Sequence, residues 1–97
     1  MTAQKAKTRL LIIDDDVLLC RMTAKYLEPM GYEVAAVHEG RRGLEEALSG
    51  QYDVVILDVM LPDNNGFQIR KQLREKSQIP LLTLTARGEE TDRIVGL

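Results

Sequence analysis

The sequence predicts an α/β fold built on a doubly wound parallel sheet, and three observations lead to this prediction. Short aliphatic runs without polar alternation occur at residues 10–13 and 54–57, as is typical of strands buried on both faces of a parallel sheet. Strand and helix patterns alternate strictly along the chain, which requires right-handed crossovers with helices on the sheet faces. Both aliphatic runs end in carboxylates, and in open α/β sheets the carboxyl ends of the strands are where ligands bind.

The first helix is predicted to follow the strand at residues 10–13. Its apolar residues recur at the three- and four-residue spacing of an amphipathic helix, and they are Leu19, Met22, Tyr26 and Leu27. Asp16 is placed to cap the first turn. Pro29 cannot sit in a helix interior, and Gly31 can adopt the left-handed conformation of a helix exit, so this helix ends near residues 28–30.

The remaining elements continue the alternation of strand and helix. They are predicted, in order, at residues 33–37, 40–48, 54–58, 67–76, 81–85 and 89–97. Gly43 weakens the interior of the helix at 40–48. A cluster of turn-forming residues at 62–66 separates the strand ending at Asp58 from the next helix.

Composition predicts a single small domain spanning residues 1–97. The chain is 44% hydrophobic and 29% charged, with a net charge of −2 and no concentrated basic block, so it is not expected to bind nucleic acid or anionic membranes by itself. No apolar stretch has the length of a membrane span, and residues 1–9 lack the apolar segment of a signal peptide, which predicts a cytoplasmic location. The single Cys20 cannot form an internal disulfide, in agreement with a reducing compartment.

Three carboxylates are the main candidates for a functional site. Asp14 and Asp15 follow the first strand and Asp58 closes the strand at 54–57. Each alone could be a turn or capping residue, but if the two strands are neighbours the three acids converge, and their repulsion must be relieved by protonation or a bound cation. Oxygen ligands of this kind favour Mg²⁺. His38 has no second histidine or cysteine near it and is interpreted as a solvated surface residue.

The motifs around these acids resemble the receiver domains of bacterial two-component response regulators. LIIDDD at 11–16 resembles the first strand with its acidic pair, ILDVMLP at 56–62 with Asn65 and Gly66 resembles the phosphoacceptor strand and loop, and LTAR at 84–87 resembles the strand that bears the switch residue. The end of the chain is most similar to the winged-helix (OmpR/PhoB-type) subfamily. The resemblance implies a flavodoxin-like sheet with strand order 2-1-3-4, and a fifth strand and last helix missing from the chain.

The resemblance also implies a role for each acidic residue. Asp58 would be the nucleophile that accepts a phosphoryl group from a sensor histidine kinase. Asp14 and Asp15 would hold Mg²⁺ together with Asp58 and the backbone carbonyl of Met60. These roles agree with the chemistry, because phosphoryl transfer requires alignment and the neutralisation of negative oxygens more than covalent work by the protein.

Further implied roles belong to residues near the end of the chain. The Thr85 hydroxyl would donate to a phosphoryl oxygen after transfer, and Ala86 would leave room for the phosphoryl group. No residue of the chain matches the family's lysine after the next strand, so the catalytic lysine role stays empty. The resemblance implies a phosphoacceptor signalling domain, not an enzyme, that catalyses only its own phosphorylation and dephosphorylation and regulates transcription through a DNA-binding domain absent from this chain.

Two other functions fit parts of the sequence. The segment at residues 11–17 also resembles the opening motif of haloacid-dehalogenase-type phosphatases, in which Asp14 would attack and Asp16 would act as acid and base. A pseudo-receiver that is not phosphorylated and only binds partners is the other alternative. In either receiver interpretation, the strand at 81–85 would be an open edge, so a homodimer through an exposed edge or exposed faces is expected.

Overall fold

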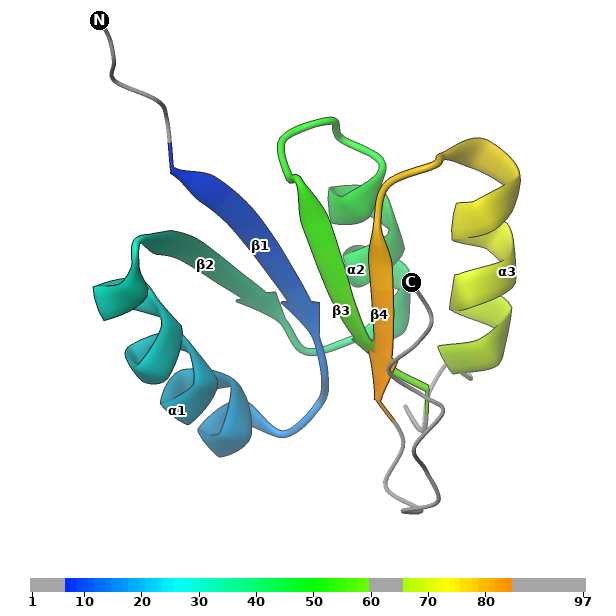
Figure 1. Cartoon of the computed structure of the whole chain (residues 1–97). Coiled ribbons are helices and arrows are strands. Elements are labelled where there is room, and N and C mark those ends of the chain that lie inside the picture. The colour runs from blue at the N-terminus through cyan, green and yellow to red at the C-terminus, as the bar shows by residue number, and fades with distance from the viewer. Residues whose placement is uncertain (1–6, 60–65, 85–97) are drawn as a thin grey trace, which may run out of the picture.

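The computed structural model describes residues 7–59 and 66–84, which form a four-stranded parallel sheet with helices on both faces (Figure 1). The strands are β1 (Thr8–Ile13), β2 (Tyr32–Val37), β3 (Val54–Asp58) and β4 (Leu81–Leu84), and the helices are α1 (Val17–Leu27), α2 (Gly40–Ala47) and α3 (Gly66–Lys76), with a short 3-10 helix η1 (Glu28–Met30) after α1. The strands lie in the order β2-β1-β3-β4, all parallel. The predicted doubly wound sheet and its order are therefore confirmed.

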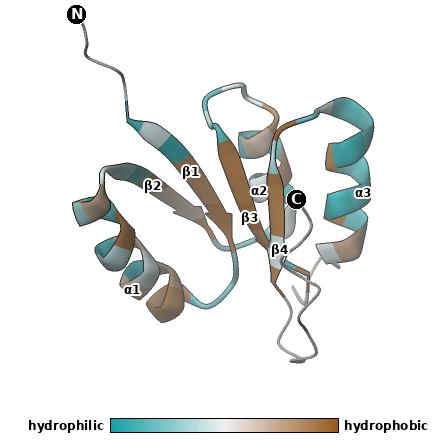
Figure 2. Cartoon of the chain, in the orientation of Figure 1, coloured by the Kyte–Doolittle hydropathy of each residue, from teal (hydrophilic) through white to brown (hydrophobic). Residues whose placement is uncertain are grey.

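The main core lies between the sheet and the helix pair α2 and α3. Alternate residues of the two central strands point to this side and are fully buried, namely Leu11, Ile13, Val55 and Leu57. Ala47 of α2 and Ile69 and Leu73 of α3 pack against them. Colouring by hydropathy shows β3 and β4 as apolar along most of their length, whereas the outer side of α3 is hydrophilic (Figure 2). Burial of each such aliphatic side chain contributes roughly 1.5–3 kcal/mol.

Helix α1 lies on the opposite side of the sheet (Figure 1). Leu19, Met22 and Tyr26 are 46%, 57% and 69% exposed, whereas Cys20 is buried. The spacing of these residues predicted the helix, which is present, but these three residues are not the ones that it buries. Thr23, Ala24 and Leu27 are half-buried, so α1 turns the side that carries these residues and Cys20 inward.

The ends of α1 are formed as predicted. The Asp16 carboxylate accepts a hydrogen bond of 2.9 Å from the backbone N–H of Leu19, which satisfies one of the free donors of the first turn. After η1, Gly31 takes a positive φ of 102°, a conformation that favours glycine. β2 begins one residue earlier than predicted, at Tyr32, and α2 ends one residue earlier, at Ala47.

Gly43 allows α2 to lie directly on the sheet. A Cβ at this position would lie 2.5 Å from Cγ2 of Ile13, which is itself fully buried. The sequence suggested that this glycine only weakens the helix. The contact gives it a second effect, because any side chain here would push α2 away from β1.

The register of the sheet brings the carboxyl ends of its strands to one level. Ile13 is paired with Val37 of β2 and with Leu57 of β3, and Asp58 is paired with Leu84 of β4. The residues that follow Ile13, Val37 and Leu57, namely Asp14, His38 and Asp58, therefore lie at the same edge of the sheet. Among residues 7–59 and 66–84, no helix has the length and hydropathy that crossing a membrane requires.

Candidate functional site

Three carboxylates gather at this edge of the sheet. Asp14 follows β1, Asp15 is the next residue, and Asp58 ends β3. Each offers an oxygen atom, and the three atoms all lie within 4.8 Å of one another. Asp14 is buried, Asp58 is half-buried and Asp15 is exposed. The structure thus brings together the acids that the sequence singled out, and a set of three hard oxygen ligands open to solvent on one side fits a Mg²⁺ ion.

Several hydrogen bonds hold Asp14 in place. Its backbone N–H donates to the carbonyl of Val37 over 3.1 Å, and its carboxylate accepts from the N–H of Asp16 over 3.0 Å. Only 5% of the residue is exposed. These contacts restrain the turn after β1, in which the neighbouring Asp15 also lies.

The burial of Asp14 disfavours its negative charge. Desolvation raises its pKa above the ordinary value, the hydrogen bond from the Asp16 backbone partly offsets this, and Asp58 and Asp15 raise the pKa further. A group that loses water and faces like charges is stabilised by protonation or by a cation. The three carboxylates therefore repel one another, and binding of a divalent cation would relieve this repulsion.

Asp16 and Cys20 lie next to this cluster without belonging to it. Asp16 caps α1, which agrees with a structural interpretation of this residue. Cys20 is buried, with its Sγ 3.6 Å from the carbonyl oxygen of Asp14. Desolvation and the surrounding aspartates raise the pKa of its thiol to about 11, so the sulfur is not a reactive thiolate.

His38 is a residue whose contact the sequence analysis missed. It was interpreted as a solvated surface residue, and it is indeed exposed, but its Nδ1 lies 3.1 Å from the carbonyl oxygen of Asp14. The sequence feature that pointed to Asp58, its position at the end of a strand, could also have pointed to His38. His38 directly follows a strand of the parallel sheet, and the ends of such strands meet at one edge.

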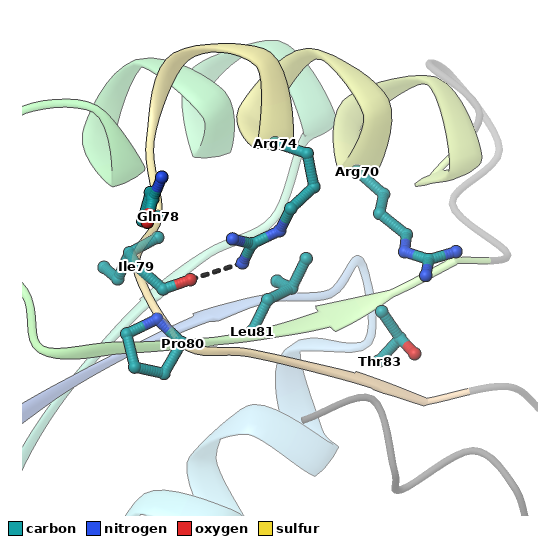
Figure 3. Close-up of a pocket in the computed structure, with 7 residues that line it drawn as sticks. All are labelled: Arg70, Arg74, Gln78, Ile79, Pro80, Leu81 and Thr83. Carbon is teal, nitrogen blue, oxygen red and sulfur yellow. Dashed lines mark hydrogen bonds between the residues drawn. The ribbon is translucent and has the colours of Figure 1, made fainter.

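A pocket elsewhere in the fold is not the site. It has a volume of about 460 Å³ and lies between α3 and β4, where it is lined by Arg70, Arg74, Gln78, Ile79, Pro80, Leu81 and Thr83 (Figure 3). Arg74 donates to the carbonyls of Ile79 and Ser77. None of the three clustered aspartates lines this pocket.

Some residues with an expected role lie outside the described part of the chain. These are Met60, whose carbonyl was expected to contact the metal, and the switch residues Thr85 and Ala86. The helix expected at residues 89–97 lies outside it as well. β4 is described to Leu84, one residue short of the predicted end.

Comparison with known proteins identifies the family. The response regulator receiver domain family matches residues 10–97. The response regulator ArlR of Staphylococcus saprophyticus is 39% identical over 90 residues, which are 93% of this chain and 41% of ArlR. The transcriptional regulatory protein ResD of Bacillus subtilis is 34% identical over 93 residues, 96% of this chain and 39% of ResD. The chain belongs to the response regulator receiver domain family and spans about two fifths of the length of these curated relatives.

Solved structures agree in fold. The non-phosphorylated HemR receiver domain of Leptospira biflexa has a TM-score of 0.79 and 31% identity, with 93% of this chain and 73% of that chain covered. TrrA of Thermotoga maritima, solved in complex with Mg²⁺ and BeF, has a TM-score of 0.77 and 30% identity over 84% of this chain and 71% of that chain. TrrA was also solved in complex with the histidine kinase ThkA, with the same TM-score and identity over 84% of this chain and 72% of that chain.

These comparisons decide between the functional classes. The chain is a receiver domain of two-component response regulators, a class of signalling domain, and it has transcriptional regulators among its relatives. The phosphatase alternative is not favoured, because the receiver family matches nearly the whole chain and the cluster includes Asp58, which that alternative does not use. The non-phosphorylated pseudo-receiver is not favoured either.

Proposed function

We propose that this receiver domain accepts a phosphoryl group on Asp58 from a sensor histidine kinase in a Mg²⁺-dependent reaction. The observation that supports this most directly is the cluster of Asp14, Asp15 and Asp58, with oxygen atoms within 4.8 Å of one another at the carboxyl ends of β1 and β3. The complex of the related TrrA with a histidine kinase supports the choice of phosphodonor. The Mg²⁺ in another TrrA structure supports the choice of metal.

In the proposed reaction, a carboxylate oxygen of Asp58 attacks the phosphorus of a phosphohistidine. The P–O bond forms while the P–N bond breaks, its electron pair returns to the imidazole nitrogen, and that nitrogen takes up a proton from solvent. The product is an acyl phosphate on Asp58 and a neutral histidine on the kinase. Asp58 ends a strand in the middle of the sheet, and this would restrict the movement of its carboxylate and favour in-line attack.

The other residues of the site would prepare Asp58 for this attack. Asp14, Asp15, Asp58 and the carbonyl of Met60 would hold Mg²⁺, which when bound supplies positive charge that offsets the carboxylates and the phosphoryl oxygens. Thr85 would then donate its hydroxyl to a phosphoryl oxygen, with Ala86 leaving the necessary space. Under this proposal, the domain catalyses only its own phosphorylation and dephosphorylation.

The wider role is proposed from the relatives. Because relatives such as ResD are named as transcriptional regulatory proteins, we propose that residues 1–97 act as a receiver domain that switches DNA binding by another domain of the protein. The acidic balance of the chain supports a role without direct DNA contact. A cytoplasmic location agrees with the free thiol of Cys20.

Mg²⁺ is expected to stabilise the folded chain. A ligand that binds only the folded state stabilises it by about 1.4 kcal/mol at ten times its Kd, which corresponds to an increase in Tm of roughly 6–11 °C for a domain of this size. Asp15→Asn removes one of the charged ligands and should abolish most of this increase. Thermal melts with EDTA and with millimolar MgCl₂ measure the effect. A wild-type Tm that is indifferent to Mg²⁺ would contradict the site.

The same melts test the electrostatics of Asp14. Its raised pKa means that ionisation is opposed in the folded state, so its contribution to stability is present at low pH and is lost as the pH rises through the folded pKa. At neutral pH without metal, Asp14→Asn should therefore raise the Tm. The difference from wild type should shrink on acidification, where wild-type Asp14 is itself neutral. The variant should also lose most of the Mg²⁺-dependent increase.

We also propose that the chain forms a homodimer. The outer side of α1 presents Leu18, Met22 and Tyr26 to solvent, and among the described strands β4 lies at an edge of the sheet. Exposed apolar side chains in a row favour a symmetric contact between two copies.

Sedimentation velocity tests the homodimer. The weight-average sedimentation coefficient should rise with protein concentration, with or without phosphorylation. Tyr26→Glu should reduce the rise, whereas the neighbouring exposed Lys25→Glu should not. Monomers at every concentration would refute the dimer.

A further inference from the structure

The end of β2 lies directly beside the acidic turn. Ile13 and Val37 are paired in the sheet, so the residues that follow them, Asp14 and His38, lie next to each other. The two strand ends are joined by two contacts. The N–H of Asp14 donates to the carbonyl of Val37 over 3.1 Å, and the carbonyl oxygen of Asp14 lies 3.1 Å from Nδ1 of His38.

The chemistry of this second contact defines the state of the imidazole. A carbonyl oxygen can only accept a hydrogen bond, so the contact requires a proton on Nδ1 of His38. The same oxygen is 3.6 Å from the Cys20 thiol, which is a much weaker donor. His38 therefore supplies the principal side-chain donor to the backbone of Asp14 among residues 7–59 and 66–84.

We propose that His38 is a positioning residue for the Mg²⁺ site. By donating to the carbonyl of Asp14, it holds the turn that directs the Asp14 and Asp15 carboxylates toward Asp58. This inference rests on the proposed metal-dependent function and adds a residue to it. The turn needs such support because its acids repel one another, and a turn that relaxes would spread the ligands apart.

His38 acts through Asp14 and not on the metal itself. Among the described residues, the groups whose ligand atoms lie within 4.8 Å of one another are the carboxylates of Asp14, Asp15 and Asp58, and His38 is not one of them. Residues that orient metal ligands affect metal affinity through geometry. The expected consequence of losing His38 is thus weaker Mg²⁺ binding with an otherwise intact fold, because the side chain is exposed.

The test compares three substitutions of His38 by titrating the protein with MgCl₂ and following amide NMR shifts of the site. His38→Ala removes the donor and should raise the Kd for Mg²⁺ by roughly tenfold, the lower end of the loss typical for residues that orient a metal ligand. His38→Asn places an amide N–H close to the position of Nδ1 and should restore the Kd to within about twofold. His38→Gln carries the same amide one methylene further out and should behave like alanine.

The melting temperature without Mg²⁺ separates this role from a general structural one. This melting temperature should change little in all three variants. The Kd for Mg²⁺ should be similar in wild type and His38→Asn, and higher in His38→Gln and His38→Ala. Equal Kd values in wild type and His38→Ala would overturn the positioning role and leave the metal site intact. A weakened His38→Ala that asparagine does not rescue would also overturn it. A wild-type protein that binds no Mg²⁺ would refute the proposed function, and the positioning role with it.

Discussion

Replacing Asp58 with asparagine is expected to reduce phosphoryl incorporation to the background of the assay. The amide has nearly the same shape as the carboxylate, so β3 and its packing should be kept, but its nitrogen and oxygen are far weaker nucleophiles than a carboxylate oxygen. Wild-type protein treated with acetyl phosphate and Mg²⁺ should gain the mass of one phosphoryl group. Intact-mass spectrometry reads both proteins directly, and the label should be stable in acid and labile in base, as an acyl phosphate is.

The chain provides a matched control at the opposite end of the same strand. Asp53 lies just before β3, where its carboxylate accepts a hydrogen bond of 2.8 Å from the N–H of Arg9. Asp53→Asn keeps an oxygen for that bond and should incorporate phosphate like wild type. If Asp58→Asn incorporated as much as Asp53→Asn, Asp58 would not be the acceptor. A phosphoryl group found on Asp14 instead would support the phosphatase alternative, in which Asp14 is the nucleophile.

The sheet and its acidic edge could be predicted because the sequence encodes them locally. Val55 and Leu57 belong to a short apolar run that is typical of a buried strand, and Asp58 ends that run. Parallel strands necessarily end at one edge, so the position of Asp58 in the sequence fixed its place in the fold. The same reasoning placed Asp14 and Asp15 after β1, and the 4.8 Å spread of the three acids agrees with it.

The orientation of α1 could not be predicted from the same kind of pattern. Apolar residues occupy more than one side of this helix, and periodicity does not say which of them faces the sheet. The spacing of Leu19, Met22 and Tyr26 predicted a helix but not which side of it is buried. The structure buries the side of Cys20, and which side of a helix is buried depends on tertiary packing.

Contacts between segments that are distant in the sequence could likewise not be predicted from the spacing of residues. The contact between His38 and Asp14 requires the register of β1 against β2, which no local spacing encodes. Gly66 is a second case. In the sequence it is the last residue of a turn-forming cluster, and in the structure it begins α3 and is buried against the end of β3.

Substituting Gly66 with alanine is expected to damage both stability and the site. A Cβ at this position would lie 2.5 Å from the carbonyl carbon of Val59 and 2.6 Å from the carbonyl oxygen of Asp58, with the Cα of Val59 closer still. These are backbone atoms, which cannot rotate away as a side chain can. Either α3 or the end of β3 must move. Overpacking of this kind costs about 1–3 kcal/mol, so the Tm should fall by roughly 4–8 °C per kcal/mol.

A second readout distinguishes a displaced site from a loosened helix. Because the clash falls on the residues that hold Asp58, the rate of phosphoryl incorporation should also fall when it is measured well below the Tm of the variant. Gln68→Ala, an exposed position on the same helix, replaces a good helix former with the best one and should leave both the Tm and the rate near those of wild type. A Gly66→Ala variant with the Tm and rate of Gln68→Ala would show that α3 can retreat from β3 at no cost. The close approach of Gly66 to the end of β3 would then not be what holds Asp58 in place.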